Sequence, residues 1–140
     1  VMYRRQHRHP VNRAIHVVCI PVIIWTVSLF LAAVHISHFM KANSLAAIVY
    51  TSMCFHHNPK TLVPMASFFA LVVASNHWAL HHVDDVYRKA LAFHVLAWFA
   101  QFVGHYGFER NRPALFDSLA QSVVAAPLLV YDEVLGDHEL

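Results

Sequence analysis

The sequence predicts an all-α fold, a polytopic membrane bundle of four to five helices in which residues 1–140 form a single integral-membrane domain. Two observations predict it. Apolar residues make up 58% of the chain and charged residues 13%, with a mean hydropathy of +0.45, whereas a soluble domain carries about 25% charged and 45–50% apolar residues. The few charges also separate long apolar runs, and several such runs in succession favour a lipid bilayer.

The uncharged runs locate the helices. A helix that spans a bilayer needs about 20 predominantly apolar residues. The first, third and fourth runs meet this length, the second is marginal and the last is short. The runs without Asp, Glu, Lys or Arg are residues 14–40, 42–59, 61–83, 90–108 and 118–131.

The first helix is expected over His16–Ser37, after a basic N-terminal segment. Its apolar run is longer than the roughly 7–15 residues of a signal peptide core, which predicts an uncleaved anchor. Pro21 lacks a backbone N–H and is expected to kink this helix. The second run, Ala42–Phe55, is short enough to lie tilted or only partly embedded, and Asn58-Pro59 predicts a turn after it.

The third helix is expected over Thr61–Leu80. The fourth is expected from Asp84, whose side chain suits a helix N-cap, to about Phe108. The last run, 113–131, is interrupted by Pro127 and is expected to lie at the membrane interface or to re-enter from it.

The distribution of basic residues orients these helices, because Lys and Arg are enriched on the cytoplasmic side. If the N-terminus is cytoplasmic and the helices alternate in direction, more basic residues lie on the cytoplasmic side than on the far side, which supports this orientation. The start of the first helix and the end of the fourth then share one side. The cytoplasmic residues would be Arg4, Arg5, Arg8, Arg13, Lys60, Arg110 and Arg112, against Lys41, Arg88 and Lys89 on the far side.

Charge and cysteine content exclude two classes of protein. The net charge of +2 is spread along the chain and forms no basic patch, which excludes a nucleic-acid-binding surface. Cys19 and Cys54 lie in apolar runs, where a thiol acts as a small hydrophobe, so they give no disulfide framework. No feature of the sequence indicates an oligomeric state.

The unusual feature is histidine, with 13 residues against 10 Lys and Arg. Polar side chains within membrane helices are costly and usually face the bundle interior. His35, His38 and His138 are expected at helix ends or in the tail, where water or the membrane interface solvates them.

The fourth helix carries a polar stripe. His94 and His105 share this face but lie about 16 Å apart at about 1.5 Å per residue, so they cannot bind one ion. His105 with Glu109 one turn on is a workable pair of ligand and orienting carboxylate, and Gly104 permits the close approach of another helix. The alternative is a stripe that only joins helices. The stripe is His94, Trp98, Gln101, His105 and Glu109.

The N-terminal segment holds a second cluster. Pro10 suits the first turn of a helix, which places Asn12 and His16 on one face. His7 lies in an extension that can fold back, and the orientation above brings His7, His16 and His105 to one membrane face. Three neutral imidazoles with open positions suit Fe(II) or Zn(II).

A rival cluster is His77, His81 and His82. Its H-x-x-x-H-H spacing is similar to the boxes of membrane desaturases and hydroxylases, which use several of them to hold two irons. The other boxes are absent, since His56-His57 is only a doublet. The predicted orientation also places this cluster on the opposite side from the end of the fourth helix.

Two segments carry longer signatures. The first reads Tyr3, His7-x-x-Pro10-x-Asn12-x-x-x-His16 and Pro21, and the second Trp98-x-x-Gln101-Phe102-Val103-Gly104-His105, Glu109-x-x-x-Pro113-Ala114-Leu115, Gln121-Ser122 and Ala126-Pro127. In this order they resemble the family of membrane proteins named for the metabolism of phytosphingosine to odd-numbered fatty acids. The resemblance covers nearly the whole chain, with the middle third loose.

The resemblance implies an Fe(II)-dependent dioxygenase of the endoplasmic reticulum. Such an enzyme performs α-oxidation of a 2-hydroxy fatty acid with O2, giving the acid one carbon shorter and CO2. The family's histidines fall on His7, His16 and His105. His81 is a further candidate metal ligand, which the predicted orientation opposes, and His9 departs from the small polar residue that we expect in the family pattern.

The remaining candidate residues would act on substrate or ligands. A 2-hydroxy carboxylate can chelate Fe2+ and can itself supply electrons, so this interpretation requires no 2-oxoglutarate. Basic residues near the headgroups could pair with the carboxylate while the alkyl chain lies between helices. The candidates are Arg13, Arg110 and Arg112 for the carboxylate, and Asn12, Gln101 and Glu109 as catalytic-site residues that orient the metal ligands.

Two further classes stay open from the sequence. Paired histidines in a helix bundle can ligate haem, so a non-enzymatic haem- or metal-binding bundle is the main alternative. A structural membrane protein whose histidines only bridge helices is the other.

Overall fold

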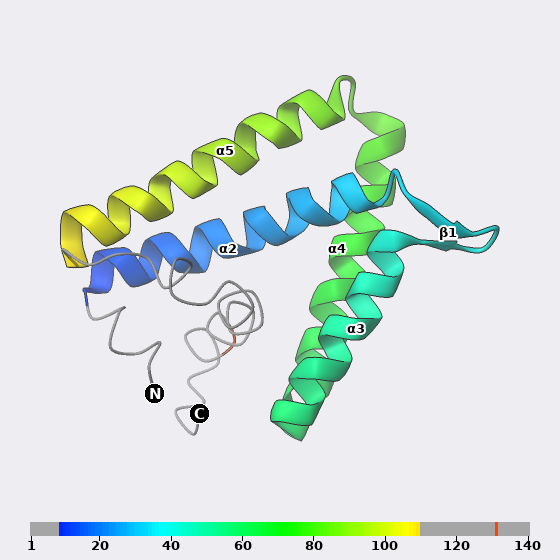
Figure 1. Cartoon of the computed structure of the whole chain (residues 1–140), viewed down its shortest axis with the longest axis horizontal. Helices are drawn as coiled ribbons and strands as arrows, with labels where there is room; N and C mark the ends of the chain where they lie inside the picture. The colour runs from blue at the N-terminus through cyan, green and yellow to red at the C-terminus, as the bar shows by residue number, and fades with distance from the viewer. Residues whose placement is uncertain (1–8, 110–130, 132–140) are drawn as a thin grey trace. The chain divides into compact units, whose positions relative to one another are not determined.

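The computed structural model describes residues 9–109 and Tyr131, and within them the chain is all-helical apart from one short hairpin (Figure 1). The expected segment 113–131 lies outside the described residues except for Tyr131. The elements are α2 (Pro10–Leu31), β1 (His35–Ser37), β2 (Met40–Lys41), α3 (Ala42–His57), a 3-10 turn η1 (Pro59–Thr61), α4 (Leu62–His82), α5 (Val86–Gly104) and a π-helical turn η2 (His105–Glu109).

The described chain divides into two compact units. The first unit contains residues 9–23 and 94–109 with Tyr131, so it joins the start of α2 to the end of α5. The second unit, Ile24–Phe93, contains the end of α2, the hairpin, α3, α4 and the start of α5. The residues of each unit contact mainly other residues of the same unit, so the two units are described separately.

Helix α2 begins at Pro10, where the sequence predicted a first helical turn, six residues before the apolar run expected from His16. His9 caps it. The ring Nδ1 of His9 accepts a hydrogen bond from the backbone N–H of Val11 at 3.2 Å, and its carbonyl accepts from that of Arg13 at 3.1 Å. Pro10 follows at the first helical position, where its missing N–H costs nothing. The histidine that departs from the family pattern therefore does the work of a small polar cap.

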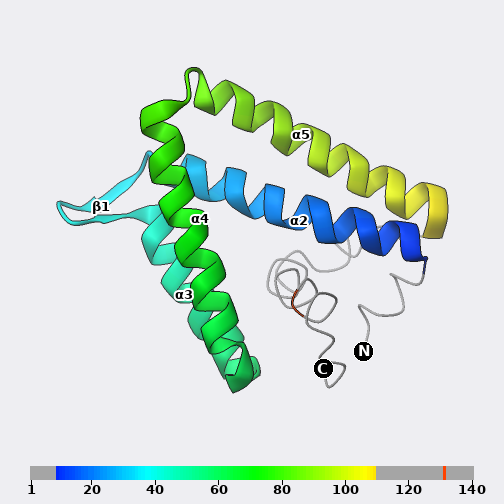
Figure 2. The same ribbon diagram turned by 180° about the vertical axis from the view of Figure 1, so that it is seen from behind.

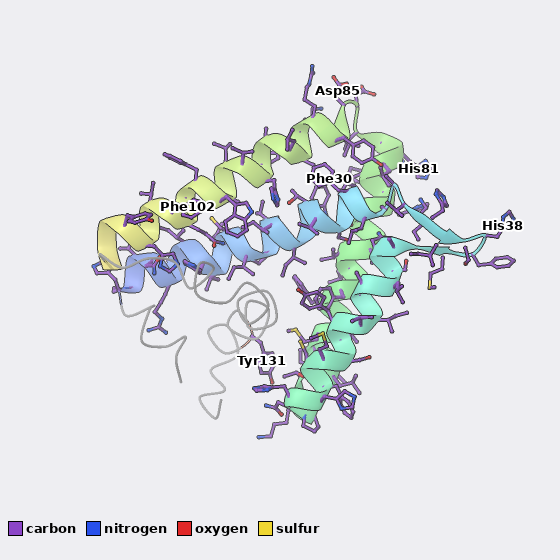
Figure 3. All side chains as sticks on the ribbon, viewed as in Figure 1. Phe30, His38, His81, Asp85, Phe102 and Tyr131 are labelled. Carbon is purple, nitrogen blue, oxygen red and sulfur yellow. The ribbon has the colours of Figure 1, made fainter. Side chains whose placement is uncertain are left out.

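The end of α2 also differs from the expectation. The helix ends at Leu31 instead of Ser37. Residues 35–41 form an antiparallel hairpin in which His35 pairs with Lys41 and Ser37 with Met40, since β-branched residues around His35 fit a strand well. Figure 3 shows His38 at the tip of this hairpin, and the neighbouring Phe39 is 96% exposed.

Helices α3 and α4 lie side by side in the second unit, as both views show (Figures 1 and 2). The predicted turn between them is confirmed. Asn58 ends α3 with its backbone N–H on the carbonyl of Cys54 at 2.9 Å, and its side chain accepts from the N–H of Lys60 at 3.0 Å. Cys54 and Cys19 are buried free thiols, as the sequence predicts.

An apolar cluster joins the end of α2 to α4 and to the start of α5. Its buried members are Leu29, Ala79, Val86 and Ala90. Two hydrogen bonds of Trp25 also join α2 to α4. The indole N–H of Trp25 donates to Ser75 Oγ at 2.9 Å, and the backbone carbonyl of Trp25 accepts from Asn76 Nδ2 at 3.2 Å.

Two helices in the described part of the chain are long and apolar enough to cross a membrane, by length and composition. They are Pro10–Leu31 and the segment Pro59–His82. Helix α3 has only 16 residues, fewer than the about 20 that a span needs, so it fits the expectation that the second run is too short to cross upright.

Candidate functional site

Burial separates the histidines. Of the histidines that the structure describes, only His16 and His105 are buried, with 2% and 4% of their surfaces exposed. Both lie in the first unit, His16 on α2 and His105 at the start of η2. An imidazole is costly to bury unless its polar atoms are used, so this pair is the natural centre of a site.

The two rings meet through the same atom type. His16 Nε2 lies 3.2 Å from His105 Nε2, with ring centroids 4.9 Å apart and planes at 86°. The sequence predicted this convergence from the alternation of the helices. It is confirmed for two of the three histidines, while His7 lies outside the described residues.

The backbone of α2 fixes the protonation state of His16. Its Nδ1 lies 2.9 Å from the carbonyl oxygen of Asn12. A carbonyl can only accept, so Nδ1 carries a proton and donates it. In a neutral ring Nε2 then holds a lone pair, which accepts a hydrogen bond from Nε2–H of His105 at 3.2 Å.

This geometry fits a metal ion. Two nitrogens that bind one ion at about 2.1 Å lie about 3.0 Å apart at an angle of about 90° and about 3.4 Å apart at about 109°. The His16–His105 separation lies within this range, so an ion that took the place of the shared proton would need little movement of the rings, and the bond of His16 Nδ1 to a carbonyl is the usual way to orient a ligating imidazole. The described residues contain no group of three His, Cys, Asp or Glu side chains that could hold a metal.

Gly104 brings the two helices together at this point. A Cβ atom built on Gly104 would lie 2.5 Å from Asn12 Oδ1 and 3.2 Å from Ile15 Cδ1. Real Cβ atoms do not approach an oxygen so closely, so any larger residue at this position would force the buried Asn12 side chain to move. The expectation that Gly104 permits another helix to approach is confirmed, and that helix is α2.

Two buried amides accompany the pair. Asn12 is fully buried and Gln101 is 9% exposed. Gln101 precedes His105 by four residues on α5, and its Nε2 finds no hydrogen-bond acceptor among the described residues. An unsatisfied buried donor costs about 1–3 kcal/mol, so this amide is suited to receive an oxygen atom from a ligand.

His94 has another partner. The indole N–H of Trp98 donates to His94 Nε2 at 3.1 Å, and the Trp98 ring lies 5.9 Å from that of Phe102. This bond occupies the His94 lone pair, which agrees with the interpretation that His94 is outside the metal motif. The stripe along α5 and η2 therefore contains one internally bonded pair, His94 and Trp98, followed by the site residues Gln101 and His105.

The other predicted site residues are placed as follows. Arg13 is an exposed residue of α2. His81 lies on α4 in the second unit, where its ring packs against His77 at 4.6 Å. Glu109 closes the backbone of η2. His7, Arg110 and Arg112 lie outside the described residues.

Sequence reasoning missed two features of the site. The residue that orients His16 acts through its backbone carbonyl, and a carbonyl leaves no trace in the side-chain pattern. The helix also changes to a π-helical turn at His105, a change that is frequent at functional sites. A glycine next to a histidine was the only available signal for it.

Comparison with known proteins agrees with these motifs. The family model 2-hydroxy-palmitic acid dioxygenase Mpo1-like matches residues 1–138. The chain is 31% identical over 134 residues to the 2-hydroxy-palmitic acid dioxygenase MPO1 of Saccharomyces cerevisiae, covering 95% of this chain and 75% of the yeast protein. No solved structure matches the chain. The chain belongs to the 2-hydroxy-palmitic acid dioxygenase Mpo1-like family.

Proposed function

We propose that this protein is an Fe(II)-dependent dioxygenase that performs α-oxidation of 2-hydroxy fatty acids in the breakdown of sphingoid bases such as phytosphingosine. One 2-hydroxy acid and one O2 would give the acid one carbon shorter, CO2 and water. This overall reaction balances in atoms and electrons, because the hydroxy acid itself reduces O2 and no other reductant is needed. The observation that carries the proposal is the meeting of two buried imidazoles, His16 and His105, from the two signature segments.

We assign His16, His105 and His7 as the iron ligands. Three neutral imidazoles that leave positions open suit Fe(II). His81 is not included, because the predicted orientation of the helices places it on the opposite side from the end of α5. Bound Fe(II) would supply the redox chemistry that a reaction with O2 requires.

The residues of the chain would do the positioning. The Asn12 carbonyl holds the proton of His16 Nδ1 and keeps Nε2 directed at the site. The Gln101 amide would donate to an oxygen of the hydroxy acid, because its Nε2 is buried without an acceptor in the described chain. Arg13, with Arg110 and Arg112, would pair with the substrate carboxylate, and Glu109 would orient His105.

We propose that the chain is integral to the endoplasmic reticulum membrane, with its N-terminus cytoplasmic. The described helices bury polar residues such as Asn12, Thr26 and Asn76 while large apolar ones such as Val18 and Leu71 are exposed, at 65% and 70%. Such an inverted pattern is typical of helices surrounded by lipid tails, where the interior is the place for polar groups. The hydrophobic chain of the substrate would reach the site from the same lipid.

The geometry favours this proposal over a haem-binding bundle. Two axial imidazoles of one haem stand on opposite faces of the porphyrin, at about twice a metal–nitrogen bond, about 4 Å. His16 Nε2 and His105 Nε2 are 3.2 Å apart with ring planes at 86°. They fit adjacent positions on one ion, with no room for a macrocycle between them.

The test is metal content together with turnover. The full chain is purified anaerobically in detergent, and bound iron and conversion of 2-hydroxypalmitate are measured. Iron that co-purifies with wild type but not with His105→Ala, together with loss of turnover, supports the assignment. His82→Ala, which changes an exposed histidine, is the control. A His105→Ala variant that keeps both iron and turnover would refute the metal assignment.

A further inference from the structure

The H-x-x-x-H-H segment at the end of α4 presents a pair of imidazoles. The rings of His77 and His81 lie 4.6 Å apart with planes at 70°, and both side chains are exposed. The His82 ring packs on a different partner. It stacks on the Trp78 indole at 5.0 Å with planes at 9°, while its Nδ1 donates to the Trp78 carbonyl at 2.8 Å. The three-histidine box of the sequence is therefore a two-histidine pair.

The pair has the spacing of two ligands to one ion. Histidines at i and i+4 on a helix hold the zinc of many metalloproteases, because this spacing places both rings on one face. The rings of His77 and His81 lie in contact, with centroids 4.6 Å apart and planes at 70°, so both can turn toward one ion.

We propose that His77 and His81 form a surface site for a divalent transition-metal ion, separate from the buried pair. Imidazole nitrogen suits Zn2+, Ni2+ and Cu2+, and affinity for such a site rises to Cu2+ in this series. Water completes the coordination. The site lies in the second unit of the chain and does not depend on the proposed enzymatic function.

Charged residues lie near the proposed site. Figure 3 shows His81 near the turn between α4 and α5, which carries Asp85. Asp85 has a φ of 53° and bonds to Arg88 at 2.7 Å, with 60% and 81% of these side chains exposed. His77 and His81 lie in the last two turns of the candidate membrane span, next to this turn of exposed charges, so we place the site at the aqueous end of the span, where an ion can reach it.

Calorimetric titration of the full-length detergent-solubilised protein with Zn2+, and separately with Cu2+, tests the proposal. Wild type is expected to bind one ion beyond any metal that co-purifies. His77→Ala and His81→Ala are each expected to weaken that binding by about tenfold or more, since even the loss of an outer partner costs 10–100-fold. His82→Ala, the matched control one residue away, is expected to bind within about twofold of wild type.

A second measurement needs no variant. Bound Zn2+ is expected to protect His77 and His81 of the wild-type protein from diethyl pyrocarbonate, with His35 and His57 as unprotected references in peptide mass spectrometry. Titration curves of His77→Ala and His81→Ala that overlay wild type would overturn the proposal. Equal losses in all three variants would also overturn it, because they would indicate a three-histidine site.

Discussion

The two histidine pairs are nearly alike in ring separation, at 4.9 Å and 4.6 Å, and opposite in surroundings. His16 and His105 come from different helices and are buried, with a backbone carbonyl holding one ring. His77 and His81 come from one helix and are exposed. The exposed pair arises from the sequence spacing alone. The buried pair requires two helices to meet at a glycine, so its geometry depends on the whole first unit.

This difference shows that burial can identify the site histidines among the many in the chain. An exposed imidazole meets water or the membrane interface in many arrangements, so exposure alone does not mark a site. A buried imidazole must use its polar atoms or raise the free energy of the fold. Of the described histidines, the burial test selects the two that also lie in the signature segments.

The largest effect is expected at the buried pair. Replacing His16 by Ala should abolish iron binding and lower turnover by more than about 100-fold, since loss of an outer-shell partner alone costs 10–100-fold. The measurement is iron content and conversion of 2-hydroxypalmitate. If His82→Ala, which changes an exposed histidine, lowers turnover as much as His16→Ala does, the distinction between buried and exposed histidines is wrong.

A smaller loss is expected when the helices are separated. In Gly104→Ala the new methyl group would collide with Asn12 and Ile15, which must move. A displacement of about 1 Å at a site can cost 10²-fold, so turnover should fall by about 10- to 100-fold with a lower melting temperature. Gly107→Ala is the control, because its Cβ would meet no described atom within 4 Å. Equal effects of the two variants would contradict the close-approach role.

The amide of Gln101 should affect substrate more than metal. Gln101→Leu keeps the approximate size of the side chain and removes the donor. One lost hydrogen bond to a charged oxygen corresponds to about tenfold in KM, and the iron content should stay at the wild-type level. A variant with wild-type KM, or one that loses iron, would refute substrate contact by this amide.

The smallest effect is expected in the second unit. Trp25→Phe removes the indole donor to Ser75 and should lower the free energy of unfolding by about 1 kcal/mol. Turnover at a temperature below the transition should be unchanged. Trp78→Phe serves as the matched variant, since the Trp78 ring is 59% exposed. Thermal unfolding in detergent measures both, and an equal shift would show that the bond contributes nothing.

Sequence reasoning located the helices and one half of the site well. The order of uncharged runs gave α2 to α5, and the alternation of directions brought His16 to His105. The start of α2 agrees with the prediction that Pro10 lies in a first helical turn. Its end was not predicted, because a hairpin replaces the last expected turns, and a hydropathy pattern does not contain strand pairing.

The details of the site needed coordinates. Spacing rules treat α5 as a uniform α-helix, so they cannot anticipate the π-helical turn that begins at His105. They also count His82 with its neighbours, although stacking on Trp78 removes it from the group. Backbone carbonyls such as that of Asn12 are present at every position, so only the fold selects the one that matters.

The contact of Gly104 with Asn12 has an evolutionary consequence. Two positions that share one small volume cannot change independently, because a larger residue at one needs a smaller residue at the other. Relatives with alanine at the position of Gly104 are expected to carry serine or glycine at that of Asn12, whose backbone carbonyl would still be present. In a double-mutant cycle, Asn12→Ser should restore part of what Gly104→Ala loses, a positive coupling in the range of 0.5–3 kcal/mol. The two signature segments would then be linked by inheritance as well as by packing.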